Sequence, residues 1–258
     1  MINIVIPMAG RGSRFSAAGY SDPKPLIMLN DKRMIEVVVN NLRPVAAHRF
    51  IFICQSSHVR EYKLEQILQH IAPGAIIVPV EGITEGAACT VLAAKALIDS
   101  SQPLMIANSD QWVDTNINHY LQQMEDCLLN GLIMTMTASD SKWSYACCDI
   151  HGNVVSVTEK QVVSDQATVG IYNYRHGSDF CRFAEQMIRN NDRSQGEFYV
   201  APVYNYMLAA GRGPLGVVNI GSEMKGMYGL GTPADLQAFC RLPVYRQAIN
   251  FGTAGESH

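Results

Sequence analysis

Three basic side chains and two glycines lie close together near the start of the chain. Glycine lets backbone N–H groups approach a polyphosphate closely, and arginine supplies forked, permanently charged donors to its oxygens. Lys24 lies between Pro23 and Pro25, which stiffen the backbone that carries its ammonium group. These residue types at this spacing predict a phosphate-binding site made by Gly10, Arg11, Gly12, Ser13, Arg14 and Lys24.

Two better-known phosphate loops do not fit this stretch. The dinucleotide-binding fingerprint needs a third glycine where Phe15 stands, and the Walker pattern needs a Gly-Lys-Ser/Thr that does not follow at the required distance. The structural alternative is a solvated turn. Residues 2–6 are apolar and β-branched except for Asn3, so we expect a buried strand that leads directly into the glycine loop.

Asp110 is the second residue that could do chemistry. It follows an apolar run at 103–107, and a carboxylate at the end of a strand can hold Mg²⁺ against a triphosphate. The alternative is that Asp110 or Asp114 caps a helix expected near 116–128.

The elements that must position these residues alternate between strand and helix in the first half. Hydrophobic periodicity predicts strands at 49–54, 74–80 and 103–107, and helices at 34–42, 60–70 and from Thr84. This alternation favours a mostly parallel, Rossmann-like α/β sheet flanked by helices, with ligands beyond the carboxyl ends of the strands.

The second half has a different pattern, which predicts antiparallel additions to that sheet. We expect strands at 132–138, 167–174 and 215–220, and a hairpin with strands at 145–150 and 154–159. Helices are expected at 177–190, 197–210 and 234–241. We interpret residues 1–242 as one domain, with a nucleotide-binding half to about 130 and an acceptor-side half at 131–242. Residues 243–258 are expected to be a tail.

Composition limits the function classes. The 258 residues include 17% charged residues and carry a net charge of −3, so the chain is globular and has no general attraction to nucleic acid or an acidic membrane. No apolar run approaches the roughly 20 residues of a membrane span, and no export signal is recognised. The seven cysteines form no Cys-x-x-Cys pair, and most lie in apolar segments. Buried free thiols in the cytoplasm are therefore expected.

Gly-x-Gly-Ser-Arg followed by Pro-Lys-Pro-Leu resembles the signature of the nucleotidyltransferases that make nucleotide-sugars, the sugar-1-phosphate pyrophosphorylases. Residues 107–111 resemble their metal-aspartate motif, and 84–88 their nucleoside-contacting segment. The resemblance implies the nucleotide-diphospho-sugar transferase fold, Mg²⁺ as the cofactor, and a nucleoside triphosphate and a phosphorylated small molecule as partners. A homo-oligomer is compatible with it. Catalytic roles are implied for Arg14, Lys24 and Asp110, with Asp110 the metal ligand. Nucleotide contacts are implied for Ala9, Gly10, Arg11, Gly12, Ser13, Thr84 and Gly86, where Gly86 would leave room for base and ribose.

The resemblance also implies an acceptor site in the second half. Lys160 would neutralise the acceptor phosphate, Glu159 would accept from its hydroxyl groups, and Gly170 would let the sugar lie against the backbone. Glu197 is a weaker match to an acceptor-binding glutamate. Read without the family, a Glu-Lys pair at a strand end indicates a solvated edge. One position departs from the pattern: Gly229 stands where the sugar-specific members often carry a second metal-binding aspartate. Asp114, another carboxylate, water or substrate oxygens could then complete the metal site.

The expected reaction joins a nucleoside triphosphate to a phosphomonoester, with a sugar 1-phosphate as the preferred acceptor, to give an NDP-sugar for surface polysaccharide synthesis and pyrophosphate. A cytidylyltransferase acting on a non-sugar phosphate, of the phosphocholine or phosphorylated amide type, remains open. A related-fold glycosyltransferase is disfavoured because 108–110 holds one carboxylate where such enzymes use Asp-x-Asp. An inactive nucleotide sensor would bind the triphosphate without releasing pyrophosphate.

Overall fold

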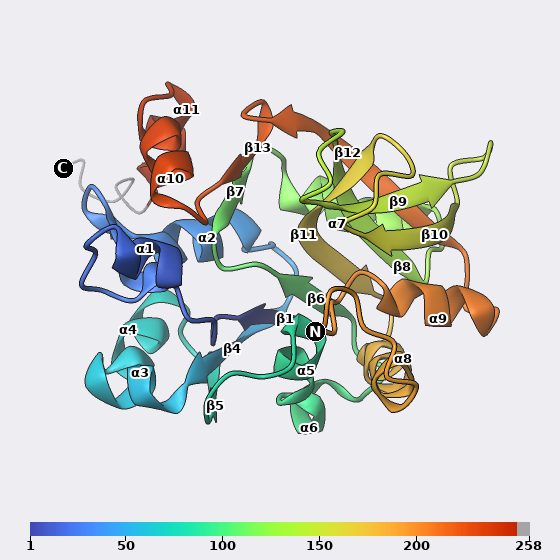
Figure 1. The fold of residues 1–258 in the computed structure, drawn as a ribbon, viewed down its shortest axis with the longest axis horizontal. Coiled ribbons are helices and arrows are strands. Elements are labelled where there is room, and N and C mark those ends of the chain that lie inside the picture. Colours follow the sequence, from blue (N-terminus) through green and yellow to red (C-terminus); the bar gives the residue numbers. More distant parts are fainter. Residues whose placement is uncertain (252–258) are drawn as a thin grey trace.

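The computed structural model describes residues 1–251 and contains one large mixed sheet flanked by helices (Figure 1). Its strands are β1 (Ile2–Pro7), β4 (His48–Gln55), β5 (Ile76–Val80), β6 (Leu104–Ala107), β7 (Gln111–Val113), β8 (Gly131–Thr137), β9 (Ser144–Cys148), β10 (Val154–Glu159), β11 (Gln166–Tyr174), β12 (Leu215–Glu223) and β13 (Gly226–Gly229). A separate hairpin joins β2 (Met28–Leu29) to β3 (Lys32–Arg33).

The sheet order is β5-β4-β1-β6-β11-β8-β12-β13-β7, with β9 attached to β11 and β10 to β9. β1 pairs in parallel with β4 and β6, while β11 runs antiparallel to both β6 and β8. The expected fold class, a mostly parallel mixed sheet with antiparallel additions in the second half, is therefore confirmed.

The helices are α1 (Ser13–Ala17), α2 (Met34–Leu42), α3 (Ser56–Glu61), α4 (Leu64–Ile71), α5 (Ala87–Leu92), α6 (Lys95–Ile98), α7 (Ile117–Asp126), α8 (Gly177–Arg189), α9 (Val203–Ala209), α10 (Pro233–Cys240) and α11 (Val244–Ile249), with a 3-10 turn η1 (Lys24–Leu26). Alternation along β1 explains the two layers of helices. Ile4 and Ile6 pack into a core with α2, α4 and α7, whereas Val5 packs on the other face with α5, α8 and α9.

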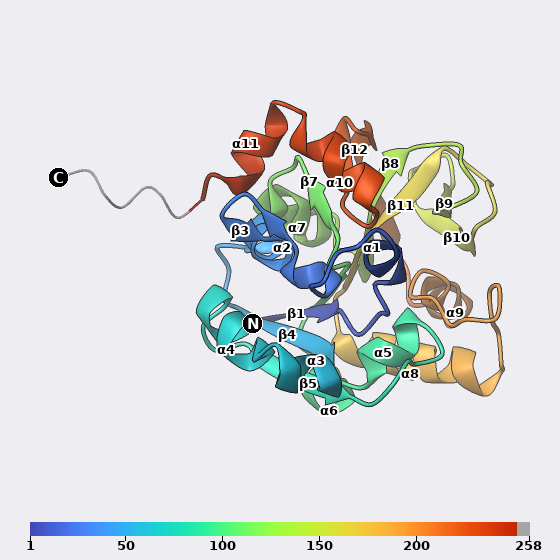
Figure 2. The ribbon, with the colours of Figure 1, turned by 60° about the vertical axis from the view of Figure 1, so that its left-hand side comes forward.

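A third apolar cluster joins the two ends of the chain. Phe15 of α1 and Val37 of α2 pack with Trp112 of β7 and with Leu236 and Phe239 of α10. In both views α10 and α11, drawn in red, lie beside the blue N-terminal segments (Figures 1 and 2). The tail expected from residue 243 therefore begins with a packed helix, because Val244, Tyr245 and Ile249 cover this cluster. The rest of that tail, 252–258, lies outside the described residues.

Two helix predictions need correction. The helix expected at 60–70 is two helices, α3 and α4, separated at Lys63, whose φ is 51°. The helix expected at 197–210 is α9 alone. Residues 194–199 cannot be helical because their backbone is used elsewhere: the Phe198 N–H donates to Glu85 O at 2.9 Å, and Phe198 O accepts from Ala88 N at 3.0 Å.

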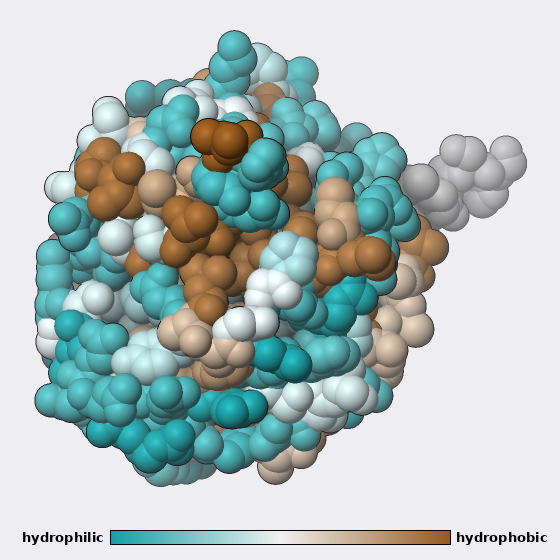
Figure 3. All heavy atoms as spheres, turned by 90° about the vertical axis from the view of Figure 1, so that its right-hand side faces the viewer, coloured by the Kyte–Doolittle hydropathy of each residue, from teal (hydrophilic) through white to brown (hydrophobic). Residues whose placement is uncertain are grey.

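The β9–β10 hairpin projects from the sheet on the side of the molecule shown in Figure 3. Apolar side chains gather in the upper part of this face, above a mainly polar lower part. Ile150 at the hairpin turn is 95% exposed and Val155 on β10 is 52% exposed. Among the described residues no helix is long and apolar enough to cross a membrane.

Candidate functional site

The glycine loop turns sharply after β1 and leads into α1. Gly12 has a φ of 61° and precedes the helix, and its carbonyl accepts from the backbone N–H groups of Phe15 and Ser16. The buried side chain of Phe15 anchors α1 by packing in the third apolar cluster. Gln55 at the end of β4 fixes the other side of the loop by donating to Ala9 O at 2.8 Å. The loop therefore has a defined shape, with polar backbone turned to a cavity of about 360 Å³.

Lys24 and Asp110 meet in this first cavity. Lys24 Nζ lies 2.7 Å from Asp110 Oδ2, and each side chain is 24% exposed. Asp110 follows β6, and the predicted capping role is wrong for both aspartates, because Asn116 is the residue whose side chain caps α7. A residue 86 positions away along the chain thus joins the phosphate-binding segment.

The charges of the first cavity balance one another. Arg11 and Lys24 line it together with Asp22 and Asp110, so the four formal charges cancel. A nucleoside triphosphate carries several negative charges, so its binding there calls for additional cations such as a divalent metal. Arg14 lies exposed on α1 and, like Ser13, lines none of the three cavities described in this subsection.

A second cavity, of about 600 Å³, continues from the glycine loop toward α5. Ala9, Gly10 and Arg11 line one side, and Thr84, Gly86 and Thr90 line the other. The Thr84 and Thr90 hydroxyl oxygens lie 2.5 Å apart, and they lie 3.1 and 3.2 Å from Gly86 O, so one hydroxyl donates to the other and the second donates to that carbonyl. Most of the predicted nucleotide contacts therefore face one space, the exceptions being Gly12, which lines only the first cavity, and Ser13.

Gly86 has a structural role that the sequence did not indicate. Its φ is 134°, and a Cβ placed on it would lie 2.4 Å from Phe198 O and 2.5 Å from Phe198 N. The close neighbour is thus the backbone of 193–199, a loop that also brings Glu197 into the second cavity.

A third cavity, of about 290 Å³, lies on the acceptor side. Glu159 and Lys160 line it with Gly170, Tyr172 and Tyr199. Glu159 Oε2 accepts a short hydrogen bond from Ser144 Oγ. Burial raises the pKa of Glu159, while the Ser144 hydrogen bond and Lys160 act in the opposite direction. The Glu-Lys pair is therefore built into a cavity rather than left on a solvated edge.

Lys160 is held by a loop from a different part of the chain. Its Nζ donates to Tyr199 Oη at 2.8 Å and to Gln195 Oε1 at 3.1 Å, and lies 4.9 Å from the centre of the Tyr199 ring. The hydrogen bond with Tyr199 raises the pKa of Lys160.

Asn108 lies where the three cavities meet, and it lines each of them. Its N–H donates to Gly170 O at 3.0 Å, and a Cβ on Gly170 would lie 2.0 Å from Asn108 Nδ2. With a φ of 76°, Gly170 makes room for this amide. Sequence reasoning missed Asn108, although it stands in the motif that contains Asp110.

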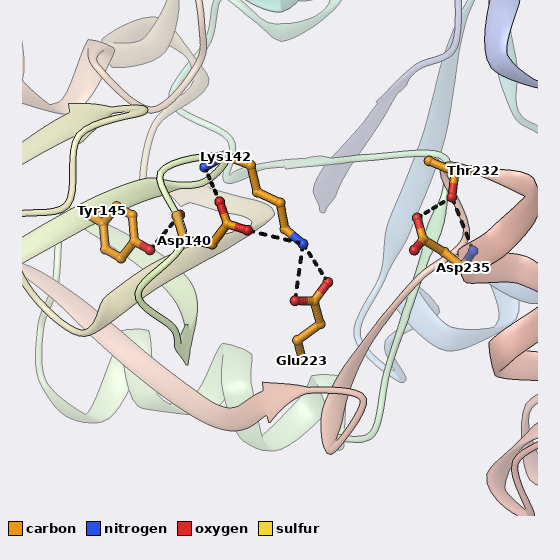
Figure 4. Close-up of polar contacts among 6 residues, drawn as sticks. All are labelled: Asp140, Lys142, Tyr145, Glu223, Thr232 and Asp235. Carbon is orange, nitrogen blue, oxygen red and sulfur yellow. Dashed lines mark hydrogen bonds and ion pairs between the residues drawn. The ribbon is translucent and has the colours of Figure 1, made fainter.

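A second lysine, Lys142, also lines the acceptor cavity and was missed by the sequence analysis (Figure 4). Its Nζ lies 2.9 Å from Glu223 Oε1 and 3.9 Å from Asp140 Oδ2, and 4.9 Å from the centre of the Trp143 ring. The pair with Glu223, which raises the pKa of Lys142, joins the loop before β9 to the end of β12.

Asp235 stands in the first turn of α10, on a different element from Lys142 (Figure 4). Its N–H donates to Thr232 Oγ1 at 3.1 Å, and its carboxylate accepts from the same hydroxyl at 2.7 Å. Gly229 lies in β13, opposite Gln111 of β7, and a Cβ there would come no closer than 4.0 Å to Asp235 Oδ2.

The donor set fits a metal bound chiefly through its substrate. Within residues 1–251 no group of three or more His, Cys, Asp or Glu side chains could hold an ion. Asp110 offers one carboxylate, and Gly231 keeps the space beside it open, because a Cβ there would lie 2.7 Å from Asp110 Oδ2. Mg²⁺ commonly uses one or two protein carboxylates and completes its shell with water and phosphate oxygens.

The cysteines differ from expectation in one respect. All seven are free thiols, but Cys54 and Cys181 alone are buried, while Cys127 and Cys240 are exposed. Burial raises the pKa of each buried thiol to about 12.

A mixed sheet whose strand ends meet a glycine loop, with a lysine-aspartate pair in the cavity beside that loop, defines an α/β enzyme of the nucleotide-transferring class. A family model described as Nucleotidyl transferase matches residues 4–212. The chain belongs to this nucleotidyl transferase family, and it is a nucleotidyltransferase.

Solved structures share the fold. A nucleoside-diphosphate-sugar pyrophosphorylase from Vibrio cholerae RC9 is 22% identical, with a TM-score of 0.79 over 93% of this chain and 100% of that chain. A protein assigned as a candidate glucose-1-phosphate thymidylyltransferase from Bacillus anthracis is 17% identical, with a TM-score of 0.68 over 92% and 93%. The inositol-1-phosphate CTP transferase from T. maritima is 12% identical, with a TM-score of 0.70 over 95% and 94%. No curated protein sequence matches this chain.

Proposed function

We propose that this enzyme transfers a nucleoside monophosphate group from a nucleoside triphosphate to a sugar 1-phosphate, releasing pyrophosphate and forming an NDP-sugar. The observation that carries the proposal is the position of Asn108, which lines the glycine-loop cavity, the cavity beside Thr84 and the cavity that holds Lys160. Triphosphate, nucleoside and acceptor would therefore meet at the carboxyl end of β6, next to Lys24 and Asp110.

In the proposed reaction an oxygen of the acceptor phosphate attacks the α-phosphorus in line. The new P–O bond forms as the bond from the α-phosphorus to the oxygen bridging to the β-phosphorus breaks, and pyrophosphate leaves. A phosphate monoester is anionic near neutral pH, so no strong base is required. Catalysis would consist mainly of positioning and charge neutralisation.

Three basic residues have a proposed part in this step. The loop N–H groups would hold the β- and γ-phosphates, and Arg14, which is exposed on α1, would turn toward them on binding. Lys24 would stabilise charge at the α-phosphate, and Lys160 would bring in the acceptor. Asp110 would hold Mg²⁺, which supplies further neutralisation of the triphosphate when bound. We assign the nucleotide to residues 1–130 and the acceptor to 131–242.

The acceptor cavity favours a polyol phosphate. The Ser144, Thr168 and Tyr172 hydroxyls and the Glu159 carboxylate offer partners to sugar hydroxyl groups. Trp143 and Tyr199 could in principle recognise a quaternary ammonium, but each already has a lysine ammonium 4.9 Å from its ring centre. Those cations would repel a choline headgroup. We further propose that the enzyme works in the cytoplasm and that its product supplies surface polysaccharide synthesis.

A cytidylyltransferase acting on a non-sugar phosphate is the second candidate. Gly229 favours it, because this glycine leaves the site without the second aspartate that sugar-specific relatives often carry. The cation contacts in the acceptor cavity argue against a choline phosphate but not against a neutral phosphorylated amide.

The test is pyrophosphate release with CTP, UTP, ATP and GTP, each against a panel of phosphorylated sugars and alcohols. We expect turnover with a sugar 1-phosphate. Turnover with CTP and a non-sugar phosphate alone would favour the second candidate, and triphosphate binding without pyrophosphate release in any combination would overturn the proposal.

A further inference from the structure

The segment from Arg193 to Tyr199 reaches both substrate cavities, although the sequence pointed only to Glu197 within it. Glu197 lines the cavity beside Thr84, and Tyr199 lines the acceptor cavity two residues later. The segment connects α8 to α9 without regular structure beyond a bridge between Ser194 and Glu197.

Several contacts fix this segment against the nucleotide side. Arg193 forms an ion pair with Glu85 and lies 4.1 Å from the centre of the Phe198 ring. The Phe198 backbone forms two hydrogen bonds with residues 85 and 88 and packs directly on Gly86. The position of the next residue, Tyr199, is therefore set by the same elements that shape the nucleotide cavity.

On the acceptor side the segment contacts one functional group, the Lys160 ammonium. Lys160 has a φ of 55°, a left-handed conformation that is unfavourable for a side-chain-bearing residue. A free lysine side chain would also lose considerable rotamer entropy when ordered. The hydrogen bonds to Tyr199 and Gln195 and the aromatic face below the ammonium oppose both costs.

We infer that Tyr199, assisted by Gln195, is a positioning residue that holds the Lys160 ammonium at the acceptor cavity. Tyr199 sets the acceptor affinity by fixing where that cation lies, and it takes no part in the chemical step. The inference rests on the proposed role of Lys160 in acceptor binding.

The variant Tyr199→Phe tests the hydroxyl alone, because the ring and its face toward Lys160 are kept. The first readout is independent of activity: the rate at which an acetylating reagent modifies Lys160, followed by peptide mass spectrometry. We expect the rate at Lys160 to rise about fivefold when one hydrogen bond is lost. Lys142, which is held by Glu223 and lines the same cavity, is the internal control and should be unchanged.

The second readout is kinetic, with the sugar 1-phosphate of highest turnover. Tyr199→Phe should raise the KM for that acceptor about three- to tenfold and leave the KM for the triphosphate near wild type. Tyr206→Phe is the matched control, since this phenol on α9 donates to Asp192 at 3.0 Å and lines none of the three cavities. In a Lys160→Ala background the Tyr199→Phe effect should vanish, because the two changes remove the same interaction.

Two outcomes distinguish a failure of the proposed acceptor site from a failure of the proposed role of Tyr199. If Lys160→Ala leaves the acceptor KM unchanged, the proposed acceptor site is wrong. If Lys160→Ala raises that KM but Tyr199→Phe changes neither the KM nor the acetylation rate, the positioning role of Tyr199 is wrong and the proposed function stands. An equal rise in both substrate KM values for Tyr199→Phe would indicate a general structural defect and would also overturn the positioning role.

Discussion

The two sides of the site differ in how far their polar groups are already satisfied. On the acceptor side, Glu159 is hydrogen-bonded to Ser144, and Lys160 is held by Tyr199 and Gln195. On the nucleotide side, Lys24 and Asp110 have only each other as side-chain partners in the described part of the chain, and Arg11 has no hydrogen bond or ion pair there.

This difference suggests a division of labour. The acceptor cavity has its charges in place before a ligand arrives, so little reorganisation would accompany acceptor binding. The nucleotide cavity has cancelled charges and one ion pair that a triphosphate and a metal could replace. We therefore expect the nucleotide side to rearrange on binding and the acceptor side to keep its geometry.

The largest expected effect belongs to Lys24. Lys24→Ala should reduce turnover on the order of 10²-fold or more, because the charge that accumulates at the α-phosphate loses its nearest cation. The measurement is kcat for pyrophosphate release, with Lys95→Ala as the control, since that lysine of α6 pairs with Glu185 of α8 and lines none of the three cavities. Near-normal turnover of Lys24→Ala would contradict the assignment of Lys24 to the α-phosphate.

Asp110→Asn should lower turnover by roughly ten- to a hundredfold and shift the Mg²⁺ dependence to higher concentration, because a hard cation loses its anionic ligand. Asp114→Asn is the matched control: this exposed carboxylate lies four residues along the chain and lines none of the three cavities. Equal Mg²⁺ titrations for Asp110→Asn and wild type would show that the metal is held elsewhere.

Gly86→Ala tests whether the two sides are joined through Phe198. An added Cβ would collide with the Phe198 backbone at an unfavourable φ, so we expect a loss of about 2–5 kcal/mol of unfolding free energy. Thermal unfolding measures it. The control is Gly196→Ala, in the segment from Arg193 to Tyr199. Gly196 has a φ of 84°, but no atom lies within 4 Å of its Cβ position, so this variant should lose distinctly less unfolding free energy. Similar losses in both would contradict the packing argument.

Glu159→Gln probes the acceptor side through pH. Burial raises the pKa of Glu159 in the folded protein above the ordinary value of 4.5. The folded state therefore favours the protonated carboxyl, and this stabilisation is full below pH 4.5 and is lost as the pH rises through the folded-state pKa. Glutamine lacks this titration. The Tm of Glu159→Gln relative to wild type should therefore increase between pH 4 and pH 7, by on the order of 1–2 °C. The KM for the acceptor should rise in the same variant. A Tm difference that is constant across this range would contradict the raised pKa.

The smallest effect concerns the cysteine thiols, none of which lines any of the three cavities. A thiol reagent at pH 8 should label Cys127 first and Cys240 next, because partial burial raises the pKa of the Cys240 thiol although the residue is exposed. Cys54 and Cys181 should stay unmodified in the folded protein, because burial keeps both as thiols. Labelled-peptide analysis measures the order. Full activity after labelling of the exposed pair is expected, and early labelling of Cys54 would contradict its burial.

The sequence predicted best what depends on neighbouring residues. The α2 boundaries, the β9–β10 hairpin and the strand that leads into the glycine loop follow from periodicity and turn residues, and they are confirmed. The rule that ligands bind beyond the carboxyl ends of the strands places the glycine loop and Asp110 at one edge of the sheet, but the contact between Lys24 and Asp110 was not predicted.

What the sequence did not predict depends on contacts between distant segments. The segment before α9 reads as helix by propensity, but its backbone is paired with residues 85–88. Tyr199 has no local pattern that marks it, and Asn108 is marked only by its place beside Asp110, because the partners that give these residues their roles lie in other parts of the chain. The short strands β7 and β13 exist because they pair with each other, and neither is long enough to leave a periodic signal.

The most direct test of the account is a crystal structure with a non-hydrolysable triphosphate and Mg²⁺. We predict the triphosphate in the glycine-loop cavity, its α-phosphate nearest Lys24, the Lys24–Asp110 contact opened, and the Lys160 contacts with Tyr199 unchanged. A ligand bound outside this cavity, with Lys24 still paired to Asp110 and Arg14 facing solvent, would contradict the account.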